Sequence, residues 1–401
     1  MAAAQSVGER DAMPDRDGWL TGTLVTFCLA GAVVTLVAGY VQTTYGDYSM
    51  TRLEVLSAVF DPDIWFDIDV WQAFLLGSEL PAHMDDVGTL VVWDQRVPRV
   101  LVGIITGATL AVSGAIFQAV TRNELASPFV LGVSSGAGTL AVSGAIFQAV
   151  TRNELASPFV LGVSSGAGFA VLATLIVFSG LATLLPLFAT IGGAVAFLTV
   201  YAIAWKGGTS PVRLVLAGVI VNMVFQSLQQ GLFFFADDLG VVQTAVSWLT
   251  GSLTATGWEE VRIALIPGIV AIVLALAGAR QLNVLVLGER TAQSLGMNVE
   301  RTRFLLSVVA IVAASVAIAV AGIVSFFGLV VPHIVRNTVG GDYRRVILGC
   351  VFAGPALMVV ADVGARLALS GTQLPVGVVT GVVGGPYFLY LMRRNQSMGE
   401  L

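Results

Sequence analysis

Charged side chains are scarce in this sequence. Only 11% of its 401 residues are Asp, Glu, Lys or Arg, whereas an average soluble domain carries about 25%. So low a charge density over the whole length excludes a soluble enzyme and a nucleic-acid-binding protein. It also excludes a disordered chain, because disorder requires low hydrophobicity together with high net charge.

Residues that bind metal ions or form disulfides are equally few. The two cysteines, Cys28 and Cys350, both lie in apolar stretches, which favours small buried residues over a disulfide or a metal site. The two histidines, His83 and His333, are far apart in the sequence. There is no phosphate-binding GxxxxGK[ST] loop, no HExxH motif and no cysteine cluster. We therefore expect no catalytic residues, no metal site and no cofactor.

Hydrophobic residues dominate instead, at 56% of the chain, with a mean hydropathy of +0.87. A transmembrane helix needs about 20 predominantly apolar residues, and about ten such stretches are present. This predicts an all-α, polytopic membrane helix bundle. The 45 glycines suit it, because small residues let membrane helices approach closely. The expected spans are 20–42, 98–120, 160–179, 182–205, 213–236, 261–280, 304–322, 324–339, 346–368 and 376–392.

The loops between these spans divide the basic residues unequally. Lys and Arg concentrate in 206–213, 280–303, 336–345 and 393–394, which share one side of the membrane if the number of spans is even. Because basic loops stay in the cytoplasm, we expect both termini there. The expected organisation is a cytoplasmic tail at 1–18, a transmembrane domain at 19–394 whose first span is retained, and a cytoplasmic tail at 395–401.

Residues 43–95 differ in composition from the rest of the chain. Ten acidic residues occur there against a single basic one, Arg52, and aromatic side chains are interspersed among them. This pattern favours an external loop with short amphipathic helices at the membrane surface. We interpret it as a solvated cap rather than as a ligand site.

A 30-residue unit occurs twice without a single difference, at 109–138 and 139–168. Repeats in solenoid proteins diverge and come in larger numbers. We therefore interpret this unit as a recent tandem duplication or a sequence-assembly error. The segment 129–150 is long enough to cross the membrane, but an additional span would move the later basic loops outside. We expect one copy to be re-entrant, peripheral or looped out.

Three arginines lie on the side where basic residues are disfavoured. Arg96 and Arg99 flank Pro98 at the head of the second span, and Arg366 ends the span that contains Asp362. A structural interpretation pairs Arg366 with Asp362 four residues earlier and lets the other two snorkel to lipid headgroups. The functional interpretation is that these planar guanidinium groups bind carboxylates of a docking protein.

The segment 287–296, LGERTAQSLG, lies in the longest cytoplasmic loop. Its charged and small residues predict a short amphipathic helix, which is either a connector or a coupling helix that inserts into a cytoplasmic partner. Further along the sequence, 322–336 predicts a kinked helix packed within the bundle, with His333 near the membrane–water interface. The candidate coupling residues are Gly288, Glu289, Arg290, Ala292, Leu295 and Gly296.

Several motifs together resemble those of the iron-chelate and cobalamin ABC-importer permeases. The resemblance covers nearly all of residues 93–394, in the right order. At 123–126 this sequence has Asn-Glu-Leu-Ala where the family usually has Asn-Pro-Leu-Ala, and it has two copies of the repeated unit where the family has one. The motifs are RVPRVLVGIITGATLAVSGAIFQAVTRNELASPFVLGVSSGAG, LVLAGVIVN, WLTGSL, LGERTAQSLG, FFGLVVPHIVR, ADVGARLAL and LPVGVVTGVVGGPYFLYLMRR.

The resemblance implies a type II ABC-importer permease of ten spans, paired as a homodimer in membrane lipid. Two copies of a separate ATPase subunit would bind on the cytoplasmic side and a substrate-binding protein outside. The chain itself would hydrolyse no ATP and bind no nucleic acid. By the same resemblance, Arg96, Arg99 and Arg366 meet acidic residues of the binding protein, 287–296 contacts the ATPase, and Thr209 and Ser210 lie nearest a cytoplasmic gate.

We therefore expect a permease in the cell membrane that moves a metal chelate inward, driven by ATP hydrolysed on a partner subunit. The chelate is cobalamin or another corrinoid, a ferric siderophore, or haem. One alternative is an ion-coupled secondary transporter, which usually has ionisable residues near the bilayer midplane; here the candidate is Asp362. The other alternative, raised only by the repeat, is a non-transporting scaffold or the inactive product of a duplicated gene.

Overall fold

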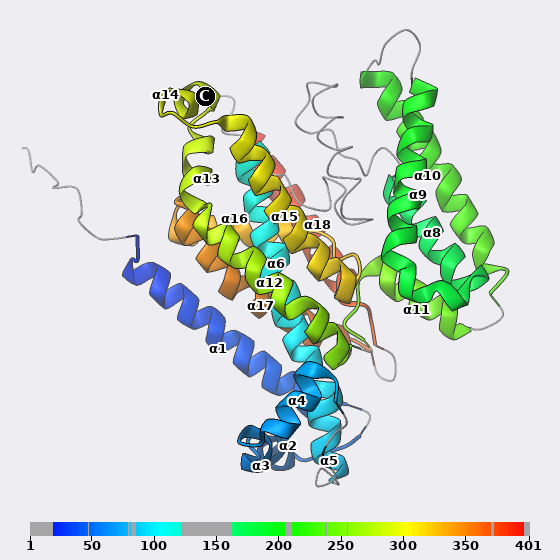
Figure 1. Cartoon of the computed structure of the whole chain (residues 1–401), viewed down its shortest axis with the longest axis vertical. Coiled ribbons are helices and arrows are strands. Elements are labelled where there is room, and N and C mark those ends of the chain that lie inside the picture. The colour runs from blue at the N-terminus through cyan, green and yellow to red at the C-terminus, as the bar shows by residue number, and fades with distance from the viewer. Residues whose placement is uncertain are drawn as a thin grey trace, which may run out of the picture.

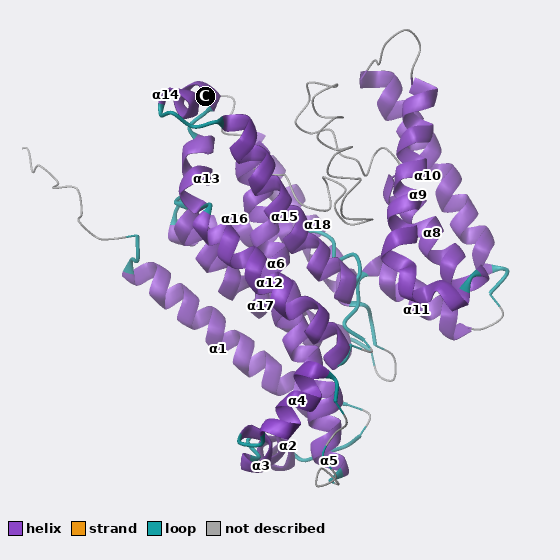
Figure 2. Cartoon of the chain, in the orientation of Figure 1, coloured by secondary structure: helices purple, strands orange, loops and turns teal. Residues whose placement is uncertain are grey.

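The computed structural model describes residues 19–46, 48–78, 81, 86–121, 163–204, 211–236, 239–254, 256–369 and 373–396. Every regular element within these residues is helical (Figure 2), which confirms the all-α class. The elements are α1 (Gly22–Thr44), α2 (Arg52–Val59), α3 (Pro62–Trp65), α4 (Ile68–Leu76), α5 (Val87–Leu90), the π-helix η1 (Val91–Arg96), α6 (Val97–Thr121), α8 (Val163–Val177), the 3-10 helix η3 (Ser179–Leu184), α9 (Leu185–Ala204), α10 (Pro211–Phe233), α11 (Leu239–Thr250), α12 (Trp258–Ala277), α13 (Ala279–Val286), α14 (Glu289–Ser294), α15 (Val299–Ala321), α16 (Phe327–Val339), α17 (Tyr343–Leu367) and α18 (Val376–Gln396).

Helix α6 forms the centre of the main helix bundle. It packs against α12, α15, α16 and α17 (Figure 1), and most of its side chains are buried. Two glycines let the neighbouring backbones approach. A Cβ at Gly107 would lie 2.5 Å from the carbonyl oxygen of Gly354 in α17, and one at Gly114 would lie 1.7 Å from that of Gly328 in α16. Such close packing matters in lipid, which supplies no hydrophobic drive for helix association.

Helices α8, α9, α10 and α11 form a second group beside this bundle (Figure 1). The end of α11 joins the two groups through backbone hydrogen bonds. The N–H of Ile323 donates to the carbonyl of Trp248 at 3.1 Å, and the N–H of Gly377 donates to that of Gly251 at 3.0 Å. The WLTGSL motif at 248–253 thus forms the junction between α11, the loop before α16 and the start of α18.

Helices α2 to α5 and η1 gather at one end of the main bundle (Figure 1), and we call residues 48–96 the outer cap, after the external loop that the sequence predicts there. Its core is a cluster of aromatic rings. Phe74 stacks on Trp258 with 4.4 Å between ring centroids, and Trp71 meets Trp93 edge-on at 5.8 Å. Because Trp258 begins α12, these rings fix the cap to the bundle.

The acidic residues of the outer cap begin several of its helices. Asp61, Asp67 and Asp86 are N-caps, and each carboxylate accepts a backbone N–H two or three residues later at 2.8 to 3.0 Å. Asp is among the preferred residues at this position, because its oxygen pairs with an N–H that lacks an intrahelical partner. Part of the acidic composition of 43–95 therefore has a local structural reason.

The expected spans coincide with helices of the described structure. They correspond to α1, α6, α8, α9, α10, α12, α15, α16, α17 and α18. Six helical stretches are long and apolar enough to cross a membrane by length and composition, and shorter apolar helices lie in α8, α9 and α18. The chain is therefore a multi-pass membrane protein. The six stretches are Gly22–Thr44, Val87–Val120, Leu216–Phe233, Trp258–Ala277, Val299–Ala321 and Tyr343–Leu367.

The duplicated unit falls largely outside the described residues. The end of α6 contains 109–121 of the first copy, and α8 begins with 163–168 of the second copy. The remainder of both copies, 122–162, is not among the described residues, nor are 1–18 and 397–401. The expectation that one copy does not span, and the domain boundaries given above, stay predictions.

Candidate functional site

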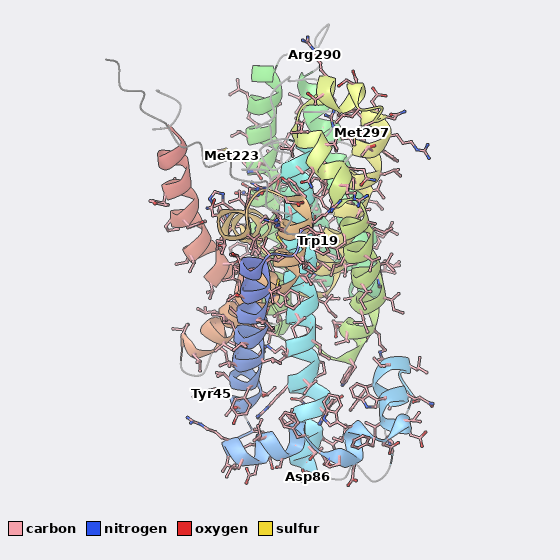
Figure 3. The ribbon with its side chains drawn as sticks, turned by 90° about the vertical axis from the view of Figure 1, so that its left-hand side faces the viewer. Trp19, Tyr45, Asp86, Met223, Arg290 and Met297 are labelled. Atoms are coloured by element: carbon pink, nitrogen blue, oxygen red, sulfur yellow. The ribbon has the colours of Figure 1, made fainter. Side chains whose placement is uncertain are left out.

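The two sets of candidate residues lie at opposite ends of the main bundle. Figure 3 shows Tyr45 and Asp86 at one end and Arg290 and Met297 at the other. Arg366 donates a hydrogen bond to the carbonyl of Tyr45, so it belongs to the cap end. Helix α14, which carries the candidate coupling residues, lies at the far end (Figure 1).

Arg99 and Asp362 form a buried ion pair between α6 and α17. Nε and Nη2 of Arg99 donate to the two carboxylate oxygens of Asp362 at 2.8 and 2.7 Å, a bidentate geometry. Arg99 is 6% exposed and Asp362 is 1% exposed. Gln42 donates from Nε2 to Asp362 at 2.5 Å, and Gln373 accepts from Nη1 of Arg99 at 3.1 Å. The network connects α1, α6, α17 and the segment before α18.

Two polar atoms of this network lack a partner within the described structure. They are Oε1 of Gln42 and Nε2 of Gln373, and both are buried. The opposite end of each amide contacts the ion pair directly. A buried polar atom without a hydrogen bond is destabilising by about 1–3 kcal/mol. In this network Oε1 of Gln42 lacks a donor and Nε2 of Gln373 lacks an acceptor.

The other two arginines hold the outer end of α1. Arg96 donates from Nη1 to the carbonyl of Thr43 at 2.7 Å, and Arg366 donates from Nη1 to the carbonyls of Gln42, at 2.9 Å, and Tyr45. The last carbonyls of a helix have no intrahelical partner, and a cation there also interacts favourably with the helix dipole. Arg96 is 4% exposed, whereas Arg366 is half-buried.

All three arginines line one cavity of about 660 Å³ at the cap end. Its walls come from the loop after α1, from η1 and α6, from the segment before α12, and from α17. Guanidinium groups gathered in a polar cavity suit the binding of carboxylates, which they can hold bidentately. The lining residues are Gly46, Tyr48, Val91, Asp94, Gln95, Arg96, Arg99, Thr254, Thr256, Gly257, Arg366 and Gln373.

The structure overturns both structural interpretations of the arginines. Asp362 forms its ion pair with Arg99 of α6, and Arg366, four residues along its own helix, donates instead to carbonyls of α1. Arg96 and Arg99 are buried, so they cannot snorkel to lipid headgroups. Sequence reasoning did not identify Gln42 and Gln373. The available signal was weak: Gln42 is a polar residue near the end of an otherwise apolar span.

At the opposite end, α14 forms the short helix that the sequence predicts. Ala292 is fully buried against the bundle, whereas Leu295 and Arg290 are exposed. Glu289 forms an exposed ion pair with Arg303 of α15 at 2.7 Å. A smaller cavity of about 350 Å³ adjoins the helix, lined by Glu289, Gln293, Met297, Asn298, Val299, Glu300 and Arg303.

Two glycines set the position of α14. Gly288 precedes it with φ of +106° and Gly296 follows it with φ of +79°, and both values favour glycine over any residue with a Cβ. These turns project α14 beyond the ends of α13 and α15 (Figure 1). The candidate gate residues Thr209 and Ser210 lie outside the described residues. Among the residues described, no three His, Cys, Asp or Glu side chains lie close enough to hold a metal ion.

Comparison with protein families gives one match that covers most of the chain. Residues 34–139 and 137–394 both match the FecCD transport family. The two matches meet at 137–139, where the first copy of the repeat ends and the second begins.

Several relatives align with most of this chain, and each alignment also covers most of the relative's own length. The Fe(3+)-citrate import system permease protein YfmD of Bacillus subtilis is 35% identical over 80% of this chain and 90% of its own length. The cobalamin import system permease protein BtuC of Halobacterium salinarum is 36% identical over 81% of this chain and 80% of its own. The iron(3+)-hydroxamate import system permease protein FhuG of Bacillus subtilis is 36% identical over 76% of this chain and 84% of its own.

A solved structure supports the fold independently. A metal-chelate type ABC transporter in an inward-facing conformation matches with a TM-score of 0.62, over 92% of this chain and 99% of the matched chain. At 22% sequence identity this match establishes the fold alone.

Proposed function

Because the chain belongs to the FecCD transport family, we propose that it is the membrane permease subunit of an ABC importer, which ATP hydrolysis on a separate subunit drives. The observation that carries this proposal is the separation of two sites. A cavity lined by three arginines lies at one end of the bundle, and a projecting helix lies at the other. A permease needs such an arrangement, since one end meets the substrate supply and the other meets the motor.

In this proposal α14 is the element that meets the ATPase subunit. Its buried Ala292 ties it to the bundle, while the exposed Leu295 and Arg290 face away from the chain's own core. A rigid attachment with an exposed apolar contact is what transmission of motion requires. The chain contributes no catalytic residue of its own, and Thr209 and Ser210 remain the proposed gate residues.

The arginine cavity is the proposed docking site for an external substrate-binding protein. Arg366 is the half-buried member of the three, so we expect it to meet a partner carboxylate first. Arg96, Arg99 and Arg366 all already donate to groups within the chain. Their use in docking therefore requires that the partner's carboxylates replace internal acceptors.

The remaining features of the proposal follow from the family and from the distribution of charge. The permease would act as a homodimer in the cell membrane, with both termini in the cytoplasm. Its substrate class is a metal chelate. The relatives named above import iron(3+) citrate, iron(3+) hydroxamates and cobalamin, and the substrate of this chain would come from the same class.

Reconstitution tests the proposal directly. The chain is placed in proteoliposomes with its ATPase subunit and its binding protein, and uptake of labelled cobalamin and of a ferric siderophore is measured with and without ATP. We expect uptake that needs ATP and both partners. Uptake that proceeds without the ATPase under a proton or sodium gradient would establish a secondary transporter instead, and no uptake under either condition would favour an inactive product.

The docking assignment has its own test. Arg366→Glu should weaken the binding protein's affinity for the permease about tenfold or more, because like charges repel across the interface. Arg52→Glu is the matched control, since Arg52 is exposed in the outer cap and does not line the cavity. Affinity is measured by surface plasmon resonance on permease in nanodiscs. Equal affinities for the two variants would remove Arg366 from the docking site.

A further inference from the structure

Helix α2 of the outer cap has two apolar faces. Val55 and Ala58 are buried, whereas Leu53, Leu56 and Phe60 are exposed by 78%, 41% and 66%. Leu53 and Leu56 of α2 and Phe60 at its C-cap follow the spacing i, i+3, i+7, so they form one stripe, which we call the outer apolar face. The buried side packs within the cap, against α5 and η1. A second, exposed apolar face needs a partner of its own.

A hydrogen bond fixes the depth of α2 relative to the membrane span. The hydroxyl of Tyr40 donates to the carbonyl of Arg52, the first residue of α2, at 3.2 Å. Tyr40 is four residues before the end of α1 at Thr44, about 6 Å along the helix axis. Helix α2 therefore begins near the level of the last turn of α1, which places Leu53 close to the end of that membrane-length helix.

The neighbouring surface of α1 identifies the partner. Leu36 and Val37 are exposed on α1, a helix long and apolar enough to cross a membrane. Tyr45 and Tyr48, both exposed, follow immediately after the span, and tyrosine is enriched where membrane meets water. The outer apolar face thus continues the exposed apolar surface of a membrane-length helix.

We propose that α2 is an interfacial membrane anchor, whose outer apolar face inserts into the outer leaflet of the bilayer. A short interfacial helix with an exposed apolar stripe can bury that stripe among the lipid chains while flanking charged residues stay in water. The exposed carboxylate of Asp63 and the half-buried one of Asp61 follow shortly after α2 and supply the water-facing side. The proposal concerns only the cap and does not depend on what the protein transports.

Helix α4 repeats this arrangement at the other side of the cap. Phe74 is buried and stacks on Trp258, the first residue of α12, while Ile68 and Leu75 are exposed at i, i+7 spacing. Exposed apolar residues such as Ile266 then continue along α12. The cap therefore contacts the leaflet beside α1 through α2 and beside α12 through α4.

Site-directed fluorescence tests the anchor in the full-length protein. The native cysteines Cys28 and Cys350 are buried and are replaced by alanine. Phe60→Cys and Leu53→Cys place an environment-sensitive nitrobenzoxadiazole label on the outer apolar face, and Asp63→Cys, at an exposed acidic position directly after α2, is the matched control. The labelled proteins are reconstituted in phosphatidylcholine vesicles with or without lipid doxyl-labelled near its headgroup, and aqueous iodide is the second quencher.

The label at positions 60 and 53 should emit at shorter wavelength than at position 63. It should also be quenched severalfold more strongly by doxyl lipid, and more weakly by iodide. Strong iodide quenching at all three positions would place the face in water and overturn the proposal. Weak quenching by both agents at positions 60 and 53 would show that protein covers the face, either a second copy or a docked partner, and would overturn it equally.

Discussion

Asp362 supplies the only carboxylate that contacts the Arg99 guanidinium in the described structure. Asp362→Asn would leave that guanidinium buried without a counter-charge. Breaking a buried pair by removing one partner is destabilising by about 3–5 kcal/mol. We expect a correspondingly lower unfolding midpoint for detergent-solubilised Asp362→Asn, measured by thermal denaturation.

The double variant Arg99→Met/Asp362→Leu provides the control for this prediction. Replacing a buried ion pair by apolar residues of similar volume is often neutral or stabilising. We expect the double variant to recover most of the stability that Asp362→Asn loses. A double variant less stable than the single one would show that the pair itself, and not the unpaired charge, holds α6 to α17.

The N-cap of α5 gives a pH-dependent prediction. The hydroxyl and backbone N–H of Thr89 donate to the carboxylate of Asp86 at 2.7 and 2.8 Å and hold the pKa of Asp86 below its usual value. Because the folded pKa is the lower one, the stabilisation is present above the unfolded pKa of about 4 and is lost as the pH falls through the folded pKa.

Asp86→Asn separates this titration from other effects of acid. Asn keeps an oxygen acceptor at the N-cap but carries no titrating carboxyl. As the pH falls below about 4 and through the lowered pKa of Asp86, we expect hydrogen exchange at the Thr89 amide, corrected for the intrinsic rate, to accelerate in the natural protein and to change little in Asp86→Asn. Equal acceleration in both would assign the pH dependence to another group.

At the scale of the elements, the close contact of α6 with α17 depends on glycine. A Cβ at Gly354 would lie 2.2 Å from the carbonyl oxygen of Gly107, so Gly354→Ala forces the helices apart. We expect a loss of about 1–3 kcal/mol, the usual effect of overpacking, measured as a lower unfolding midpoint. Gly364→Ala is the control on the same helix, since nothing lies within 4 Å of its added Cβ. Equal midpoints for the two variants would contradict the close contact.

The positions of the helices were predictable because each span depends on a local property. The stretch 98–120 was expected from hydropathy and α6 is Val97–Thr121; 346–368 was expected and α17 is Tyr343–Leu367. The short helix α14 was also visible, from a run of small and charged residues. About 20 consecutive apolar residues identify a transmembrane helix, so its position can be predicted without knowledge of the tertiary structure.

The arginine network could not be predicted in the same way. The charge distribution placed Arg96, Arg99 and Arg366 on one side of the membrane, but not in contact with particular partners. Arg99 and Asp362 are 263 positions apart, and Gln42 is 320 positions from Asp362. Whether an arginine is exposed to lipid headgroups or buried in an ion pair depends on how α1, α6 and α17 pack, which hydropathy does not specify.

At the scale of the whole molecule, the two candidate sites have to communicate through the bundle between them. Helix α6 begins at the arginine cavity and crosses to the far half, where Ser113 donates to the carbonyl of Ala310 in α15 at 2.7 Å and Gln118 donates to that of Leu329 in α16 at 3.3 Å. Helix α15 follows directly after α14. Helices α15 and α6 therefore form a continuous packed connection between α14 and the cavity.

The duplicated 30-residue unit is the feature that departs most from the family pattern. Deleting one copy gives a prediction about the whole molecule. Deleting 109–138 or 139–168 yields the same polypeptide, because the copies are identical. The shortened chain keeps every residue type that α6 and α8 use in their contacts, including the equivalents of Ser113 and Gln118. It also leaves the single unit expected from the family resemblance. We therefore expect the deletion to preserve or improve folding, measured by size-exclusion chromatography and by the unfolding midpoint in detergent.

A deletion of equal length at 163–192, which removes α8 and part of α9, is the control and should abolish folding. If the deletion of 139–168 abolishes it too, then the second copy is an integral part of the fold, and the interpretation of the repeat as dispensable is wrong.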